Sequence, residues 1–481
     1  MTSAEGLLSR RNAPVVVAAV ALVTLGAFEN RAISTALPTM LTELDAVTSY
    51  GLVGAAPLAT YLVSVAGAGW WADRRGPATV LRMGAATFVA GMVATGAATS
   101  LPLLIVGRLL AGFAEGLLDV GLMVLVATVL EPQLRPKIVA TFAAAWVLPS
   151  VAGPVLTGFV TAWVGWRWIF AAGPLVLGLA WLALRPALGL AQAQRPHTAS
   201  ATHGLEEREG DGSVGSVIPV IRWAGVAAAA LVALSLATEE LQATGATALG
   251  GTAGAVALSL GTLGVLRASA RRILPPGALR AACGIGGVVA LRGLLSAAFV
   301  GVGAFLPLVL TVLRHHGPVS AGISLSITGV TWTMGSMLQG RWPGRPLVLL
   351  RAGFGLVTMG LAATSLIVWL DAPTAVGLAG WALAGIGIGV TSGTLSVLTM
   401  SASNESNQGR NNAGGQMAAS IGSAVFLAVA GGVLALFGEP SRAAFGVISA
   451  LAVGVALTGL LATRRARCAV PDPPAAVRAG T

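Results

Sequence analysis

Three ionisable residues lie inside one long nonpolar segment of the sequence. Arg108, Glu115 and Asp119 fall within residues 101–130, which are otherwise almost all apolar. Each residue of an α-helix advances by about 100°, so steps of seven and four residues keep these three side chains on one face. A cation beside two carboxylates can form ion pairs and can accept and release protons.

The segment that carries these charges has the length and composition of a membrane-spanning helix. Ionisable groups are costly at membrane depth, and they usually face a protein interior or a water-filled cavity that serves transport or proton transfer. The charged stripe therefore predicts an ion-handling site inside a membrane protein.

The composition of the whole chain has the same implication. Of its 481 residues, 55% are hydrophobic and 10% are charged, whereas soluble domains have about 25% charged residues. The net charge is +11, but the basic residues separate apolar segments and form no basic cluster with aromatic residues, so we expect no nucleic acid as a partner. No histidine or cysteine has the spacing of a metal site or accompanies a nucleophile motif. We therefore expect no enzymatic activity, metal or cofactor.

About fourteen apolar segments are long enough to cross a membrane, so we expect an all-α polytopic membrane protein. Barrel strands are excluded because they need only about ten residues and alternate polar with apolar positions. A polar segment at about 190–215 divides the apolar segments into two groups. These groups comprise residues 14–38, 48–71, 78–100, 102–130, 137–163 and 167–187, and then 217–237, 244–266, 281–313, 318–340, 346–370, 373–400, 411–437 and 441–463.

Arginine residues gather in alternate gaps between these segments, as the positive-inside rule describes for cytoplasmic loops. If the N-terminus is cytoplasmic, the outer gaps contain only Arg167, Arg314 and Arg442. Both ends of the chain are basic, which predicts an even number of helices and two cytoplasmic termini. Arginine greatly outnumbers lysine, and alanine and glycine are abundant, as in proteins from GC-rich bacterial genomes. We expect a multi-pass protein of the bacterial cytoplasmic (inner) membrane.

The sequence also repeats internally. Pro77–Gly84 and Pro346–Gly353 share a proline, an arginine and a glycine at matching positions, 269 residues apart. Gly107–Gly116 aligns with Gly380–Gly389, 273 residues apart. Chance similarity between helices rich in Ala, Leu and Gly is the alternative. Parallel repeats of this kind occur in transporters, with the substrate between the two halves.

The repeat predicts where the charges lie and how the chain is divided. Arg108 aligns with Trp381 and Glu115 with Ile388, so the charges belong to the first half alone. We expect Arg292, near the start of a later apolar segment, to extend to the inner surface. The predicted units are a six-helix bundle (1–188), a cytoplasmic polar linker (189–216), two extra transmembrane helices (217–270), a second six-helix bundle (271–465) and a cytoplasmic tail (466–481).

A loop between the second and third apolar segments resembles a known signature. Residues 69–77 read Gly-Trp-Trp-Ala-Asp-Arg-Arg-Gly-Pro and resemble the motif Gly-x-Leu-Ala-Asp-Arg-x-Gly-Arg-Arg of the major facilitator superfamily, with Pro and Ala where the family ends in basic residues. In that family the Asp and Arg form a cytoplasmic charge network that stabilises the outward-facing state. By this resemblance Asp73 could pair with Arg135 across the inner surface. The match holds at Gly69, Asp73, Arg74 and Gly76.

Further motifs resemble a branch of the same family. Arg108 to Gly112 resembles Arg-x-x-Gln-Gly of the fourth helix, with Ala111 in place of Gln; in proton-coupled members this Arg is tied to proton transfer. The antiporter motif Gly-x-x-x-Gly-Pro-x-x-Gly-Gly of the fifth helix is matched by Gly153, Pro154 and Gly158, which favours export over uptake.

The first apolar segment strengthens this resemblance. Glu29 stands where drug exporters have Asp in the pattern Asp-x-Thr-Ile-Val-Asn-Val-Ala-Leu-Pro, and Arg31 and Ser34 depart from it. The chain is most similar to the fourteen-helix drug/proton antiporters, and the resemblance covers nearly all of it. It implies a major facilitator fold with two six-helix bundles and a two-helix central insertion.

Glu29 and Arg31 are expected at the same membrane depth as Arg108 and Glu115. Removal from water favours the neutral form of a carboxylic acid, and a neighbouring arginine favours the charged form. We hypothesise that Glu29 or Glu115 carries a proton, that Arg108 tunes it, and that Asp119 continues the path inward. A fixed ion-pair network that joins the first and fourth helices is the alternative.

Three functions remain open at this point. The first is a proton-coupled antiporter that exports hydrophobic or amphiphilic small molecules by alternating access, driven by the proton gradient. The second is a dedicated exporter of a lipid or metabolite on the same fold, and the third is a membrane sensor that transports nothing. The expected partners are a small-molecule substrate, protons and the lipid bilayer, and we expect a monomer.

Overall fold

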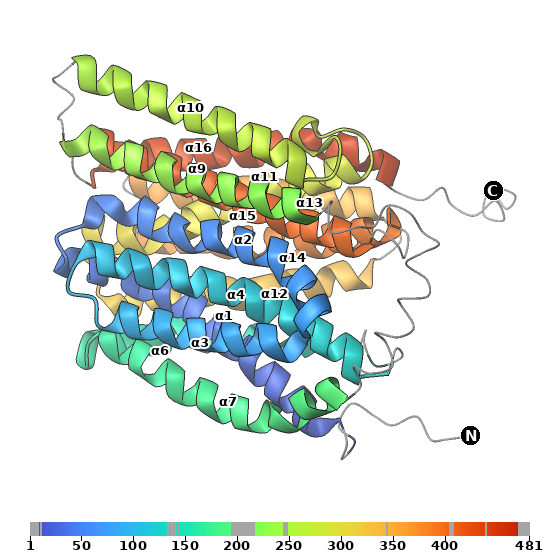
Figure 1. Ribbon diagram of the computed structural model, residues 1–481. Helices are drawn as coiled ribbons and strands as arrows, with labels where there is room; N and C mark the ends of the chain where they lie inside the picture. The colour runs from blue at the N-terminus through green and yellow to red at the C-terminus, as the bar shows by residue number, and fades with distance from the viewer. Residues whose placement is uncertain are drawn as a thin grey trace, which may run out of the picture.

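The protein is a bundle of long helices that run in nearly parallel and antiparallel directions (Figure 1). The computed structural model describes residues 9, 12–131, 134, 138, 141–142, 144–193, 217–243, 249–342, 345–370, 372–403, 408–437 and 440–469. Within these residues the chain forms fourteen labelled α-helices and no strand. Ten of the helices in this part of the chain are long and apolar enough to cross a membrane. The predicted all-α, fourteen-helix fold is confirmed.

The helices fall into two sets of six with a pair between them. The first set is α1 (Ala13–Glu43), α2 (Tyr50–Arg75), α3 (Pro77–Gly96), α4 (Leu101–Val129), α6 (Val147–Trp163) and α7 (Arg167–Ala193). The pair is α9 (Val217–Ala243) and α10 (Leu249–Ile273). The second set is α11 (Ile285–Leu308, extended by a π turn at Val309–Leu313), α12 (Pro318–Arg341), α13 (Pro346–Trp369), α14 (Thr374–Ser401), α15 (Gln408–Phe437) and α16 (Arg442–Ala462).

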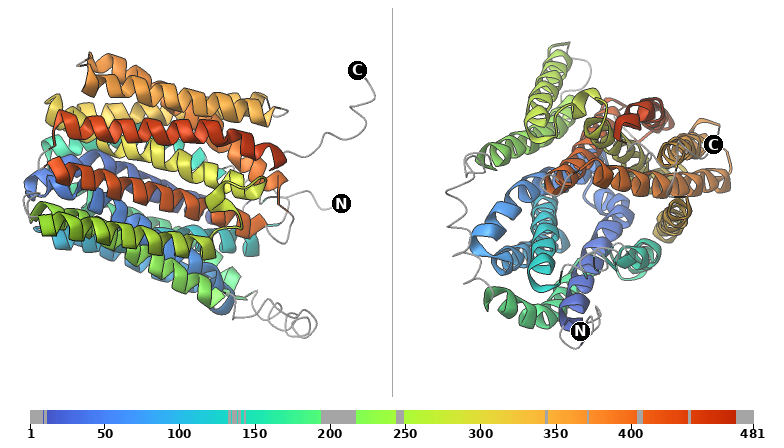
Figure 2. Two further views of the ribbon diagram at one scale, coloured as in Figure 1. Left: turned by 90° about the horizontal axis from the view of Figure 1, so that it is seen from above. Right: turned by 90° about the vertical axis from the view of Figure 1, so that its right-hand side faces the viewer.

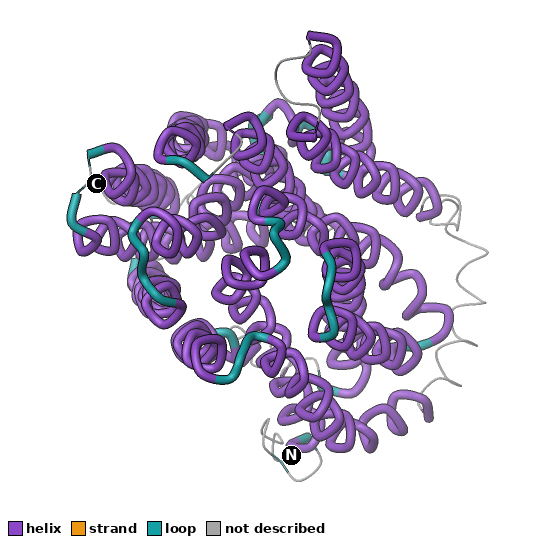
Figure 3. Tube along the Cα trace, turned by 90° about the vertical axis from the view of Figure 1, so that its left-hand side faces the viewer, coloured by secondary structure: helices purple, strands orange, loops and turns teal. Residues whose placement is uncertain are grey.

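Helix α1 begins and α16 ends at the same end of the bundle, which we call the terminal end (Figure 1). We call the opposite end, where α1 finishes, the far end. The end-on views show the two sets of helices side by side, with the α9–α10 pair on the outside (Figures 2 and 3). Helix α9 packs against α2 of the first set and α15 of the second, so the inserted pair contacts both halves.

Local chemistry explains why the second and third helices are separate. Gly76 ends α2 with φ of 83°, a backbone conformation that side chains other than glycine rarely adopt. Pro77 then occupies the first turn of α3, where its missing N–H costs nothing. The predicted motif loop is therefore a tight turn at the terminal end of the bundle.

The same backbone contacts recur in the two halves. A Cβ atom added at Gly91 of α3 would lie 2.9 Å from the backbone nitrogen of Ala111 in α4. At the equivalent place in the second half, a Cβ at Gly360 of α13 would lie 2.4 Å from the nitrogen of Ala384 in α14. Small residues let the backbones of membrane helices approach closely. The repeat predicted from the sequence is therefore present in the packing.

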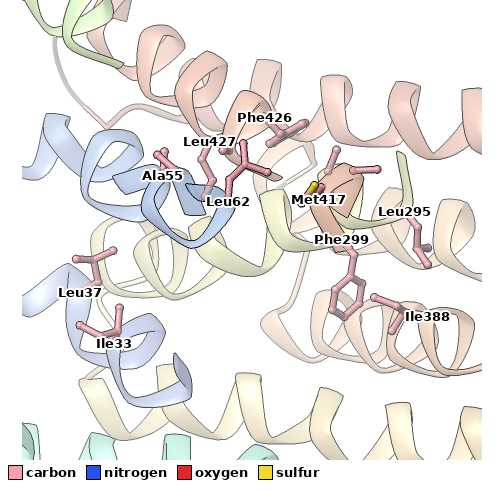
Figure 4. Packing of buried hydrophobic residues seen from close by; sticks show 14 of the residues in the cluster. Ile33, Leu37, Ala55, Leu62, Leu295, Phe299, Ile388, Met417, Phe426 and Leu427 are labelled. Carbon is pink, nitrogen blue, oxygen red and sulfur yellow. The ribbon is translucent and has the colours of Figure 1, made fainter. Parts of the chain in front are cut away.

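The two halves meet closely near the far end. A Cβ at Gly51 of α2 would lie 2.7 Å from the Cα of Gly431 in α15, and the hydroxyl of Tyr50 donates a hydrogen bond to the carbonyl of Ala304 in α11. Deeper in this seam, Leu427 of α15 packs against α2, as Figure 4 shows. We call the contact between α2 and α15 the α2–α15 seam. The far end of the bundle is therefore closed.

Candidate functional site

The centre of the first half contains a buried ion pair between α1 and α4. The guanidinium Nη1 of Arg108 donates to the carboxylate Oε1 of Glu29 over 2.5 Å. The side chains are 5% and 8% exposed. A buried charge is costly unless it is paired and hydrogen-bonded. Two of the residues that the sequence singled out therefore meet across the bundle, 79 positions apart in the chain.

Two more carboxylates continue from this pair along α4. Glu115 is partly buried and lies within electrostatic range of Glu29, Arg108 and Asp119. Asp119, one turn further toward the terminal end, is exposed, and its Oδ2 accepts a hydrogen bond of 3.1 Å from the hydroxyl of Tyr61 in α2. The stripe predicted for α4 thus leads from a buried ion pair to a solvent-accessible acid.

A small cavity connects these acids. Glu29, Glu115 and Asp119 line a space of about 30 Å³ together with apolar side chains from α1, α3 and α4 and with Trp146. A water molecule needs roughly 10–15 Å³ of such volume, so the cavity has room for one or two waters. It is large enough for water between the carboxylates and too small for an amphiphilic substrate.

Arg31 does not join this cluster. Residues two positions apart on a helix point about 200° away from each other, so Glu29 faces α4 while Arg31 lies beside α6. A Cβ at Gly153 of α6 would be 3.6 Å from the Cβ of Arg31. The Nε atom of Arg31 is buried without a hydrogen-bond partner among the described residues. The sequence had grouped Arg31 with Arg108 and Glu115, and the structure separates them.

The antiporter-like motif lies where α6 meets the second half. A Cβ at Gly158 would lie 2.7 Å from the carbonyl oxygen of Pro318 in α12, and a Cβ at Gly322 of α12 would lie 2.2 Å from that of Pro154. Gly153 has room for a side chain, since a Cβ there would make only ordinary contacts. The motif therefore contributes a close contact between the two halves at Pro154 and Gly158.

The motif loop at the terminal end is only partly explained by the structure. Asp73 is exposed, and the guanidinium of Arg74 lies 4.4 Å from the centre of the Trp70 ring. A Cβ at Gly69 would meet nothing within 4 Å, so of the two motif glycines only Gly76 is required by the backbone. Arg135 lies outside the described residues, and its pairing with Asp73 stays a prediction.

The second half contributes polar groups that the sequence reasoning missed. Arg292 was expected to reach the inner surface, and this expectation was wrong. Helix α11 begins seven residues earlier, at Ile285, which places Arg292 about 10 Å inside the helix. Its Nη1 atom is buried, and its side chain packs at Gly415 of α15. An arginine within an apolar segment, the signal that had identified Arg108, also marked this residue.

Glu43, at the far end of α1, is a further residue that the sequence did not single out. Its two carboxylate oxygens accept hydrogen bonds from Nε1 of Trp166 over 2.6 Å and from Nη1 of Arg167 over 2.5 Å. Arg167 also donates to the carbonyl of Ala98 over 3.1 Å. The pair is exposed, at 40% and 46%, so we interpret it as a surface clamp that joins α1 to α7.

Comparison with known proteins agrees with this architecture. The family model described as Major Facilitator Superfamily matches residues 19–425. The chain belongs to this superfamily. Its members are transporters and not enzymes, in agreement with the prediction that the chain is no enzyme.

Curated relatives match part of the chain. It is 28% identical over 155 residues to the multidrug efflux pump SdrM of Staphylococcus aureus, a match that covers 32% of this chain and 35% of the pump. It is 32% identical over 117 residues to a multidrug resistance protein B homolog of Mycobacterium tuberculosis, covering 24% of this chain and 22% of that protein. The matched stretches thus span about a third or less of these relatives.

Solved structures match almost the whole chain at low identity. A POT family peptide transporter in an auto-inhibited form aligns with a TM-score of 0.64 and 17% identity, over 96% of this chain and 98% of the other. A D-xylose-proton symporter aligns with a TM-score of 0.61 and 15% identity, over 94% and 98%. These similarities show the major facilitator fold.

Proposed function

We propose that the protein is a secondary active transporter, a proton-coupled antiporter that exports hydrophobic or amphiphilic small molecules. The observation that carries this proposal is the row of acids in the first half, which runs from the buried Glu29–Arg108 pair through Glu115 to the exposed Asp119. Ionisable groups inside a membrane bundle are retained for ion or substrate movement. The similarity of the chain to two multidrug pumps supports export of amphiphilic compounds.

In the proposed mechanism the acids of this row divide the work. Glu29 or Glu115 carries the proton, and Arg108 tunes it by pairing with the carboxylate that is ionised. The small cavity between Glu29, Glu115 and Asp119 provides room for water along the row. Asp119 then exchanges the proton with the solvent at its exposed side. Arg31, which lies apart from the row, takes part in shaping the cavity next to α6.

We further propose that the two halves rock about the site during alternating access. The moving units are the bundles 1–188 and 271–465, connected by the linker 189–216 and the helices 217–270, and followed by the tail 466–481. The far-end contacts at Gly51 and Gly158 support a state that is closed on that side. The motif residues Gly69, Asp73, Arg74 and Gly76, with Arg135, stabilise the opposite state.

The positive-inside distribution of arginine supports cytoplasmic termini in a bacterial inner membrane. In that orientation the far end faces outward, and this conformation is open toward the cytoplasm, where a substrate for export would enter. The transporter acts as a monomer and needs only the proton gradient, without a metal or cofactor.

A dedicated exporter of one metabolite or lipid is the second candidate. The chain is 29% identical over 175 residues to a transporter of the acurin A biosynthesis cluster of Aspergillus aculeatus, covering 34% of this chain and 32% of that protein. The transport chemistry at the row of acids would be the same, and only the substrate would differ. A membrane sensor without transport is the weakest candidate, because no part of the described chain folds outside the bundle.

The test uses the full chain in liposomes with a proton gradient that is acidic inside. We expect uphill accumulation of several chemically different amphiphilic dyes, and loss of the accumulation when an uncoupler collapses the gradient. Accumulation of a single compound class would support the dedicated exporter. Accumulation that persists with the uncoupler, or no movement of any compound, would contradict the proposed antiport.

A further inference from the structure

A chain of polar groups crosses from the first half to the second at the level of Asp119. The hydroxyl of Tyr61 in α2 donates to Asp119 Oδ2 over 3.1 Å. The side-chain amide of Gln416 in α15 lies within hydrogen-bonding reach of the same Tyr61 oxygen. Four elements contribute to this chain, because Arg292 of α11 lies next to Gln416 and interacts electrostatically with Tyr61.

The hydrogen bonds in this chain have a direction. A tyrosine hydroxyl has one proton, and the proton of Tyr61 points to Asp119, so the Tyr61 oxygen is the acceptor toward Gln416. Asp119 is therefore the final acceptor. A hydrogen bond to an ionised carboxylate is roughly twice as strong as one between neutral groups. The strength of the link between the halves thus depends on whether Asp119 is ionised.

The position of this chain matters because it lies in the α2–α15 seam. Gly51 and Gly431 contact one another near the far end of the seam, and Tyr61 and Gln416 meet three helical turns deeper. Figure 4 shows the sequence neighbours Leu62 and Met417 among the buried side chains of this region. Opening the far end requires α2 and α15 to separate, so the Tyr61 contacts must break when the halves rock.

We propose that Tyr61 is a positioning residue that holds the two halves together while Asp119 is ionised and without substrate. Protonation of Asp119 weakens the link, and so does a substrate group that takes the place of the Tyr61 hydroxyl. Either event allows the far end to open, whereas the empty, ionised protein stays closed. This inference rests on the proposed proton-coupled antiport and supplies a reason for its coupling, because a transporter without cargo would not change state.

The groups around Asp119 define what else could respond to pH. On its own helix Glu115 lies one turn away, with Glu29 and Arg108 beyond it. From the other elements Tyr61, Gln416 and Arg292 face the site. Only Tyr61 contacts both Asp119 and the second half in the described part of the chain. Its hydroxyl is therefore the atom to remove.

The experiment measures the distance between the halves at the far end of the full chain in lipid nanodiscs. Genetically encoded spin-label amino acids replace Val164 of the first half and Leu436 of the second, both of which are exposed. In the wild-type protein we expect acidification to raise the ratio of open to closed molecules by about fivefold to tenfold, as for a charge-assisted hydrogen bond that becomes neutral. In Tyr61→Phe the ratio should be raised already in alkali and should change less than about twofold with pH.

Tyr50→Phe is the matched control. Tyr50 also joins the halves through its hydroxyl, but its acceptor is the carbonyl of Ala304, which does not titrate. This variant should raise the open fraction equally at every pH and keep the wild-type response. Gln416→Leu, which removes the link from the other side, should behave like Tyr61→Phe.

The inference is overturned if Tyr61→Phe keeps the wild-type pH response, if Tyr50→Phe flattens the response as much, or if the wild-type protein shows no response. The proposed function is judged separately, by gradient-driven transport of the wild-type protein in liposomes. A wild-type protein that transports with the gradient but whose Tyr61→Phe variant responds normally to pH would retain the function and refute the role of Tyr61.

Discussion

The two halves of the molecule cross their first and fourth helices with different chemistry. In the first half, Glu29 of α1 pairs with Arg108 of α4 over 2.5 Å. In the second half, the corresponding helices α11 and α14 cross through Phe299 and Trp381, whose rings stack with centroids 4.7 Å apart at 15°. Phe299 follows Glu29 by 270 residues, and Trp381 follows Arg108 by 273. An ion pair and an aromatic stack therefore occupy equivalent places.

The difference teaches which half can respond to a proton. An aromatic stack has no protonation state near neutral pH, so the second half holds its crossing under all conditions. The ion pair exists only while Glu29 is ionised. The backbone contacts at Gly91 and Gly360, in contrast, are common to both halves. Shared glycines thus provide the architecture, and the substitution of charges for aromatic rings provides a site that can switch.

The largest effect should come from breaking the ion pair on one side only. Arg108→Met leaves Glu29 buried without a partner, which should cost about 3–5 kcal/mol of stability, whereas the double variant Glu29→Leu/Arg108→Met should unfold within about 1 kcal/mol of the wild type. Thermal unfolding in detergent measures both. The double variant should also lose gradient-driven transport. A single variant as stable as the double one would contradict a buried pair.

Adding one methyl group should affect the two halves alike. Gly91→Ala and Gly360→Ala both place a Cβ against backbone atoms, at 2.9 Å and 2.4 Å, and overpacking of this kind costs about 1–3 kcal/mol. We expect Gly360→Ala to unfold at the lower temperature, because its contact is closer. Gly355→Ala in the same helix is the control, since a Cβ there meets nothing within 4 Å. Equal unfolding temperatures for all three variants would refute the shared close contact.

The smallest effect should come from the aromatic crossing. Phe299→Leu keeps most of the buried volume and loses the ring contacts with Trp381, which should cost about 1–2 kcal/mol. The loss should be the same in acid and in alkali, because no titratable group is removed. Unfolding temperatures over a range of pH measure this. A cost that changed with pH would show that the second half also contains a proton-dependent crossing.

Some of the site could be predicted from the sequence and some could not. The spacing of Arg108, Glu115 and Asp119 in an apolar segment was sufficient to place them on one stripe, because helical periodicity is local. The partner of Arg108 needed an estimate of depth as well, and the estimate grouped Arg31 with Glu29 although they point to different sides of α1. Such errors arise because depth is read from the sequence more easily than direction.

The contacts that cross between halves were beyond the sequence. Nothing local in Tyr61 or Gln416 indicates that a tyrosine of α2 reaches an amide of α15, since these residues are 355 positions apart. Arg292 had the same signal as Arg108 and was assigned to the surface only because the start of its helix was placed too late. The fold itself was predictable, because fourteen apolar segments and one internal repeat constrain it strongly.

Uphill transport driven by a proton gradient tests the central claim, that the charged half carries the proton, most directly. Glu29→Gln and Glu115→Gln are each reconstituted in liposomes beside Glu43→Gln, which removes a carboxylate from the exposed clamp at the far end. We predict that at least one of the first two variants loses gradient-driven accumulation while downhill exchange persists, and that Glu43→Gln accumulates substrate like the wild type. If Glu29→Gln and Glu115→Gln both retain uphill accumulation, the acids form a fixed ion-pair network and the account is wrong.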